Sequence, residues 1–313
     1  MTETLLFKPN KQQTEIIKAV LYFEVFQYPL TIQELYENSA VHLTETEFET
    51  QFQELLDQDL LRLEQGFVLS STAEPGSIDR RIRGNTKAQE VLPLAYHYSQ
   101  RIASFPFVEG VCISGSLSKN YFDEQSDIDF FIITKPNRLW ICRTLLILRY
   151  KTLPKNKRKY WCTNYFIASD NLEIPDVNSF TGTELAYLLP TVNYSVYEQL
   201  LKENSWYKNH FPNKALAKKE RSLPARQPWY KGLIESFFVA GFGEWIDNRL
   251  LGITLRHWQK KYPDMANTDF ELQFRSRKNV CKRHTKGFQN KILNLWEEKQ
   301  RTFESKFNTV FHP

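Results

Sequence analysis

The 313-residue sequence lacks the features that mark membrane-spanning and secreted proteins. No stretch approaches 18 consecutive apolar residues, so we expect no transmembrane helix and no membrane partner. The first ten residues lack a basic region followed by an apolar one, the pattern typical of a signal peptide. We therefore expect a cytoplasmic protein.

Cysteine is also scarce, with four residues and no C-x-x-C pair. Without such a pair, and with six histidines scattered along the chain, a structural zinc site is not expected. Cys112, Cys142 and Cys162 lie in apolar or mixed stretches, where a buried free thiol is common. This usage fits a reducing compartment.

Internal repeats and low-complexity tracts are absent as well. A hydrophobic content of 42% and an aromatic content of 14% indicate a folded chain, and its length allows two or three domains. The net charge of +5, from 41 basic and 36 acidic residues, weakly favours anionic partners.

Basic residues gather in three segments, each of which could contact a triphosphate or a nucleic-acid backbone, or form a solvated surface. They are Lys151, Lys155, Lys157, Arg158 and Lys159; Lys214, Lys218, Lys219, Arg221 and Arg226; and Arg275, Arg277, Lys278, Lys282, Arg283 and Lys286.

Residues 1–75 predict helices over 14–26, 32–38 and 44–60, followed by a hairpin formed by 61–63 and 67–69. This order resembles a winged helix-turn-helix domain. The third helix, however, is acidic and contains no lysine or arginine, so it would repel a DNA duplex. We favour a packing or dimerising role for this domain over DNA binding.

Small residues and two carboxylates mark one short region, Gly115-Ser116-Leu117-Ser118 followed by Ser126-Asp127-Ile128-Asp129. Apolar, β-branched segments over 111–114 and 130–134 predict a strand, a Gly-Ser turn, a loop and a second strand. Because side chains alternate along a strand, Asp127 and Asp129 are expected to point to the same face.

This pattern suits transfer of a nucleotidyl group from a nucleoside triphosphate such as ATP. Asp127 and Asp129 offer hard oxygen ligands for Mg²⁺ or Mn²⁺, and the triphosphate would complete the coordination. Gly115 lets the backbone approach a phosphate, while Ser116 adds an N–H and a hydroxyl as donors. The alternative is a pair of solvated carboxylates at a strand edge beside an ordinary turn.

The segment from Gly115 to Asp129 resembles the signature of the nucleotidyltransferase superfamily, which includes DNA polymerase β and the aminoglycoside and antitoxin-type nucleotidyltransferases. Short motifs over residues 80–313 resemble a narrower group of prokaryotic nucleotidyltransferase-domain proteins. These motifs are Arg138-Leu139-Trp140 with Arg143, Cys162-Thr163-Asn164-Tyr165-Phe166, Thr183-Glu184, Asn204-Ser205-Trp206, Phe211-Pro212-Asn213 and Phe311-His312-Pro313. The resemblance implies an α/β (α+β) fold with a short mixed sheet and a nucleotidyltransferase activity, and it names no acceptor.

Many members of the superfamily carry a third carboxylate on a later strand. The matching strand here, 161–167, offers Asn164, which can coordinate Mg²⁺ but cannot act as a base. Glu184, expected near the start of a helix, is our first substitute, although the helix macrodipole would equally favour an acid there. Asp170 and Glu173 come next.

The expected nucleotide-binding residues are Gly115, Ser116, Ser118, Lys119, Ser126 and Arg143. Lys119 and Arg143 are expected to neutralise the departing pyrophosphate. The acceptor could be a protein, a nucleic acid or a small molecule. The alternatives are a catalytically degenerate nucleotide-binding module and a winged-helix nucleic-acid-binding regulator.

Long helices are predicted over 80–104 and 138–150, and the chain beyond Pro190 is predicted to be wholly helical. The helices expected there cover 194–203, 229–251, 255–261 and 278–307. The apolar run 237–242 indicates a helix–helix or homodimer contact. We expect three domains: a winged-helix-like domain over 1–75, a nucleotidyltransferase core over 76–190 and a helical domain over 191–313.

Overall fold

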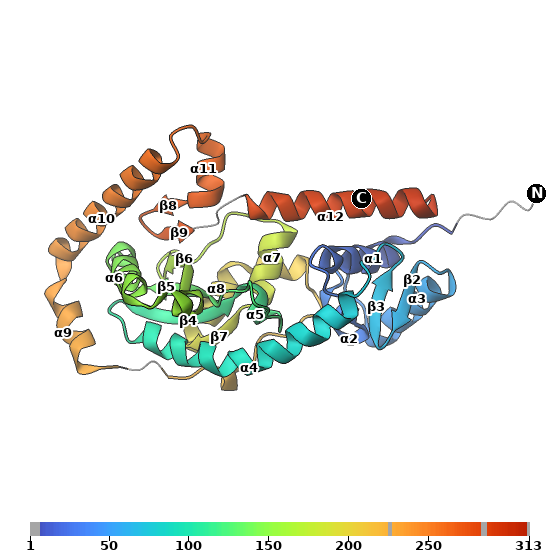
Figure 1. Cartoon of the computed structure of the whole chain (residues 1–313), viewed down its shortest axis with the longest axis horizontal. Coiled ribbons are helices and arrows are strands. Elements are labelled where there is room, and N and C mark those ends of the chain that lie inside the picture. Colours follow the sequence, from blue (N-terminus) through green and yellow to red (C-terminus); the bar gives the residue numbers. More distant parts are fainter. Residues whose placement is uncertain (1–6, 225–226, 283–286, 312–313) are drawn as a thin grey trace, which may run out of the picture.

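A six-stranded mixed sheet lies at the centre of the computed structural model, which describes residues 7–224, 227–282 and 287–311 (Figure 1). The strands are β4 (Val108–Ser114), β5 (Asp129–Thr134), β6 (Cys162–Ala168), β7 (Leu189–Val192), β8 (Ser276–Arg277) and β9 (Val280–Lys282). Their order is β7-β4-β5-β6-β9-β8, and every described pair is antiparallel except β5 with β6. The predicted α/β class with a short mixed sheet is confirmed.

The central pair of strands follows from the apolar segments that flank the Gly-Ser motif. Val111 lies opposite Ile132, and Ile113 lies opposite Phe130, as expected for two β-branched and aromatic strands. A register shift near Gly110 lets β4 begin at Val108, before the predicted start.

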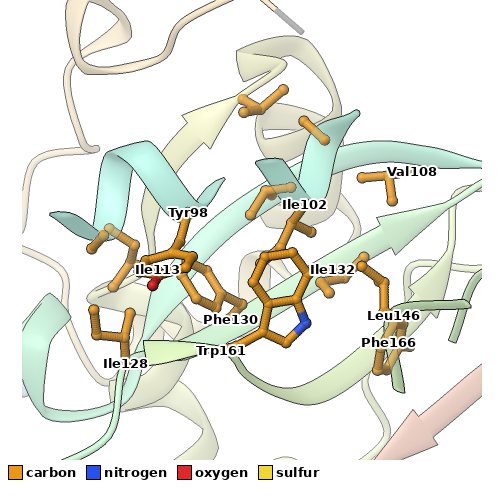
Figure 2. Close-up of a cluster of buried hydrophobic side chains, with 14 of the residues drawn as sticks. Tyr98, Ile102, Val108, Ile113, Ile128, Phe130, Ile132, Leu146, Trp161 and Phe166 are labelled. Carbon is orange, nitrogen blue, oxygen red and sulfur yellow. The ribbon is translucent and has the colours of Figure 1, made fainter. Parts of the chain in front are cut away.

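Helices cover both faces of this sheet, which follows from the alternation of side chains along β5. Phe130 and Ile132 point toward α4 (Ser77–Ala103) and α6 (Leu139–Thr152), where Figure 2 shows them packed around Trp161. On the opposite face, Phe131 and Ile133 join a second buried cluster under two further helices. Those helices are α7 (Ser179–Ala186) and α8 (Tyr194–Glu203).

The N-terminal elements follow the predicted order of helices and hairpin. They are α1 (Lys11–Glu24), β1 (Leu30–Thr31), α2 (Ile32–Asn38), α3 (Glu45–Asp57), β2 (Leu61–Glu64) and β3 (Phe67–Ser70), with a small sheet ordered β1-β3-β2. Thr31 and Thr44 cap α2 and α3, each in a capping box with a glutamate three residues on. The winged-helix assignment itself stays a prediction.

The last helix, α12 (Phe288–Phe307), packs into the N-terminal hydrophobic core. Its Ile292 and Phe303 are buried there, and the Trp296 indole donates to the Lys18 carbonyl oxygen at 3.0 Å. The hydrophobic clusters therefore cross the predicted boundaries at 75 and 190, and the three-domain division also stays a prediction.

Two C-terminal predictions are wrong. The helices expected over 229–251 and 255–261 are instead α9 (Trp229–Phe237) and α10 (Ala240–Lys261), so the break falls earlier. The helix expected over 278–307 begins only at Phe288, because β9 adds to the edge of β6 and pairs Lys282 with Tyr165. Tertiary pairing overrides the helical propensity of the lysines and arginines in this segment.

The remaining elements are short helices. They are α5 (Gly115–Ser118), α11 (Asn267–Phe274) and three 3₁₀ helices over Lys155–Tyr160, Ser205–Asn209 and Lys219–Arg221. In the described part of the chain, no helix has both the length and the apolar character needed to cross a bilayer.

Candidate active site

A cavity of about 760 Å³ lies on the α7 side of the central sheet, between α1, the strands and α12. Eight of the site residues predicted from the sequence line it: Gly115, Ser116, Lys119, Ser126, Asp127, Asp129, Asn164 and Glu184. The cavity wall also includes apolar and aromatic side chains from α1, α7 and α12, such as Phe23, Phe180 and Leu295. The structure thus brings together residues from distant parts of the sequence.

Asp127 and Asp129 both face this cavity, although only Asp129 belongs to β5. Asp127 lies in the preceding loop. Pairing with the segment before β6 nevertheless continues through Ile128, whose N–H donates to the Lys159 carbonyl oxygen at 2.8 Å. This extended pairing preserves the predicted alternation and keeps the two carboxylates on one side.

The surroundings of Asp129 disfavour its charged form. Burial, together with the nearby carboxylates of Glu184 and Asp127, raises the pKa of Asp129 to about 7. Burial also raises the pKa of Asp127, against the opposing effect of the Lys159 charge. Both carboxyl groups therefore lie where a cation would stabilise them.

Asn164 holds the carboxylate of Asp129. It sits at a bulge in β6, where the register passes from Phe130 opposite Thr163 to Phe131 opposite Tyr165. Its side-chain Nδ2 donates to Asp129 Oδ1 at 2.6 Å. A bulge re-aims a side chain in this way, and the amide fixes the carboxylate without being able to accept a proton from a substrate.

Gly115 begins the turn after β4 and touches the same carboxylate. Its φ of +68° lies in the left-handed region that favours glycine. A Cβ at this position would lie 2.4 Å from Asp129 Oδ2. Both the backbone conformation and the space beside Asp129 therefore require glycine.

Glu184 and Lys119 form an ion pair at the edge of the cavity, with Lys119 Nζ 2.8 Å from Glu184 Oε1. The Gly115 N–H also points to Glu184, at 3.4 Å from Oε2. Glu184 was expected near the start of a helix, but α7 begins at Ser179 after the Asn178 cap, so Glu184 lies near its end. The macrodipole therefore does not explain this acid.

The two remaining serines of the motif are engaged in local hydrogen bonds. Ser126 lines the cavity, and its hydroxyl donates to Asp123 Oδ1 at 2.7 Å. Ser118 is buried away from the cavity, and its hydroxyl donates to the Gly115 carbonyl oxygen at 2.9 Å. Ser118 therefore supports the turn and does not face the cavity.

Arg143, Asp170 and Glu173 also lie away from the cavity lining. Arg143 is buried on α6, which packs on the opposite face of the sheet, and its guanidinium lies over the Trp140 ring. Asp170 and Glu173 are exposed in the loop after β6. The role of Arg143 in neutralising pyrophosphate and the role of either acid as the third carboxylate stay predictions, and the described positions do not support them.

Asp176 and Lys282 also line the cavity; Asp176 was missed in the sequence, and Lys282 was named only as part of the third basic segment. Asp176 accepts two hydrogen bonds from Arg275, both at 2.8 Å, and a third from Lys282 at 3.2 Å. Burial alone would raise the pKa of Asp176, but these cations outweigh it and lower the pKa. The basic charge of the third segment was the sequence feature that pointed to Lys282. The pairing of β9 with β6 brings this side chain to the cavity.

The donor set suits a divalent cation only if the nucleotide supplies further ligands. Over residues 7–224, 227–282 and 287–311, no group of three or more His, Cys, Asp or Glu side chains is arranged to hold a metal ion. Two adjacent carboxylates, one buried with a raised pKa, nevertheless fit Mg²⁺, which commonly binds through one or two carboxylates and substrate phosphates.

Comparison with known protein families agrees with this geometry. The sequence model of the nucleotidyltransferase domain matches residues 99–188, which run from the end of α4 to the end of α7 and contain the Gly-Ser motif and both aspartates. The chain therefore carries a domain of the nucleotidyltransferase superfamily, whose general chemistry is nucleotidyl transfer. Searches of curated proteins and of solved structures found no match.

Proposed function

We propose that the chain transfers a nucleoside monophosphate from a triphosphate bound with Mg²⁺ or Mn²⁺ to an acceptor hydroxyl or amine, releasing pyrophosphate. The main support is that Asp127 and Asp129 lie beside Gly115 in one cavity, within the segment that matches the nucleotidyltransferase domain. ATP is one such donor. The acceptor would be a group on a protein, a nucleic acid or a small molecule.

In this proposal the polar residues around Gly115 have separate tasks. Asp127 and Asp129 would hold the divalent cation, which when bound supplies positive charge against the phosphates. Asn164 keeps Asp129 oriented through its 2.6 Å hydrogen bond. Ser116 would donate to a phosphate oxygen, and Lys119 would offset the charge that develops on pyrophosphate.

The transfer step forms one bond and breaks another. The acceptor oxygen or nitrogen attacks the α-phosphorus in line, and the bond to the bridging oxygen breaks, so that its electron pair leaves with pyrophosphate. The acceptor's proton must pass to a base. We assign this role to Glu184, because Asn164 cannot accept the proton, and because Glu184 lines the same cavity and lies close enough to Asp129 to raise its pKa.

The second candidate is a nucleotide-binding module that performs no transfer. Two observations favour it: Asn164 occupies the position where a third carboxylate is usual, and Glu184 is already paired with Lys119. This module would bind the triphosphate with its metal but release no pyrophosphate. By contrast, α3 exposes only acidic charges, which argues against a DNA-binding regulator.

The decisive experiment follows the label from each α-labelled nucleoside triphosphate, with Mg²⁺ or Mn²⁺, into purified acceptor candidates and into cell extract. We expect transfer by the wild-type chain and none by the double variant Asp127→Ala, Asp129→Ala. The melting temperature of the double variant without metal should be unchanged or higher, because two carboxylates that repel each other are removed.

The matched control is Asp170→Ala, which removes an exposed acid outside the cavity and should leave transfer intact. A double variant with full activity would refute the site assignment. Metal-dependent triphosphate binding in calorimetry without any label transfer would instead select the binding module.

A further inference from the structure

Helix α9 turns its charged side chains toward the protein. Lys231 is buried, and its Nζ donates to the carbonyl oxygens of Ala103 at 2.9 Å and Val108 at 3.0 Å. One turn later, Glu235 pairs with Lys135 at 2.6 Å. These contacts fix the rotation of the helix about its axis, because turning it would leave buried polar groups without partners.

The opposite side of α9 is apolar and faces solvent. Trp229, Leu233 and Phe237 follow at intervals of four residues and are 79%, 61% and 69% exposed. In most surface helices such a stripe faces the core. Because Lys231 and Glu235 are held against the protein, the apolar stripe cannot pack into the core of its own chain.

The apolar surface continues onto the start of α10. Phe242 meets Phe237 edge to face, with ring centroids 5.8 Å apart, and stacks on Trp245 at 6.3 Å. We call the whole surface the α9–α10 face, formed by Trp229, Leu233, Phe237, Val239, Phe242 and Trp245.

This face is too large to be left in water. Its side chains expose on the order of 700 Å² if each aromatic residue offers roughly 200 Å². Monomeric proteins rarely expose an apolar patch above a few hundred Å². One side of a standard protein interface buries about 800 Å², so the α9–α10 face has the size that a stable dimer needs.

We propose that the α9–α10 face binds a second copy of this chain in a two-fold symmetric dimer. The apolar positions of α9 are symmetric about Leu233, with Trp229 four residues before it and Phe237 four residues after. Two α9 helices packed antiparallel across a two-fold axis place Leu233 against its own copy and Trp229 against the partner's Phe237. The exposed Gly232 and Ser236 let the two helices approach closely.

The charge of the face agrees with this partner. Lys231 and Glu235 are the two charged residues of α9, and both point inward, so the stripe itself is neutral. A helix that binds an anionic lipid surface carries cations on its polar face beside the apolar one. Figure 1 places α9 at the opposite end of the molecule from α2 and α3, clear of the N-terminal elements.

Sedimentation velocity of the full chain from about 1 to 100 µM tests the proposal. We expect a dimer for the wild type and a monomer for Leu233→Arg, with the dissociation constant of the dimer raised at least ~100-fold because two like charges meet at the axis. The matched control is Leu63→Arg, an exposed leucine on β2, which should leave the dimer unchanged.

A second pair of variants reports on the geometry. Under oxidising conditions, Leu233→Cys should form a disulfide between two chains, whereas Leu63→Cys should not. A wild-type chain that is monomeric at 100 µM would overturn the proposal, and so would a dimer that survives Leu233→Arg. Binding of a monomeric chain to vesicles of phosphatidylcholine and phosphatidylglycerol would also overturn it, in favour of a lipid surface.

Discussion

Gly115 is the residue at which the site tolerates the least change. In Gly115→Ala, the new Cβ would displace the Asp129 carboxylate and would also force alanine into a left-handed conformation. We expect label transfer to fall below detection and the free energy of unfolding to drop by about 1–2 kcal/mol. Transfer assays and urea denaturation measure the two effects.

A matched glycine separates the two effects. Gly66, in the turn between β2 and β3, has a φ of +81°, and a Cβ there would meet nothing within 4 Å. Gly66→Ala should therefore lose a similar free energy of unfolding while keeping full transfer. Equal loss of transfer in both variants would show that backbone strain, and not contact with Asp129, sets the effect of Gly115→Ala.

Single residues were predictable where local geometry decides their position. Asp127, Asp129 and Gly115 lie within one strand–turn–strand unit, so spacing alone brings them together. Lys282 reaches the same cavity through pairing with a strand more than a hundred residues earlier, and spacing carries no information on that. The position of Arg143 was not predictable, because a helix can pack on either face of the sheet, and α6 packs on the face away from the cavity.

At the scale of elements, α6 depends on a residue from another helix. Asp247 of α10 is buried, and its Oδ1 accepts hydrogen bonds from the backbone N–H groups of Trp140 at 2.8 Å and Ile141 at 2.9 Å. Burial raises the pKa of Asp247 to about 6 despite these bonds. The junction between α6 and α10 should therefore respond to pH.

The raised pKa fixes the direction of that response. Between about pH 4 and pH 6, folded Asp247 keeps a proton that the unfolded chain releases, so the unfolding free energy falls as pH rises and then levels off. Asp247→Asn has no carboxyl group to titrate at this position, so its unfolding free energy lacks this pH dependence. We expect the wild type to lose roughly 2–3 kcal/mol relative to the variant between pH 4 and pH 7. Urea denaturation across that range measures it, and parallel curves would contradict it.

Elements with their own capping signals were easier to predict than elements formed by long-range pairing. Thr31 and Thr44 carry local N-cap signals, and α2 and α3 begin where these predict. The strand β9 has three residues in a basic segment, and this segment was predicted to belong to the helix over 278–307. Only the open edge of β6 explains the strand.

At the scale of the whole molecule, Asp176 joins the central sheet to the C-terminal segments. It binds Arg275 and Lys282, and Lys282 also donates to Gln289 at the start of α12. Asp176→Ala should lower the unfolding free energy by about 3–5 kcal/mol, because two largely buried cations lose their carboxylate. Urea denaturation measures this loss.

The comparison for Asp176 is an ion pair exposed to water. Glu297→Ala removes the partner of Arg301 on the outside of α12, and we expect a change of about 0–1 kcal/mol. If both variants lost the same small amount, the Asp176 contacts would contribute no more than a surface pair.

The cavity wall runs from Phe23 on α1 to Leu295 on α12, and this has a consequence for synthesis on the ribosome. The edge of β6 emerges about a hundred residues before β9, which is roughly ten seconds at ordinary translation rates. During that interval the nascent chain presents an unpaired strand edge that other chains can join. A chain that stalls before α12 has an incomplete cavity wall, so premature products would lack part of the proposed nucleotide site.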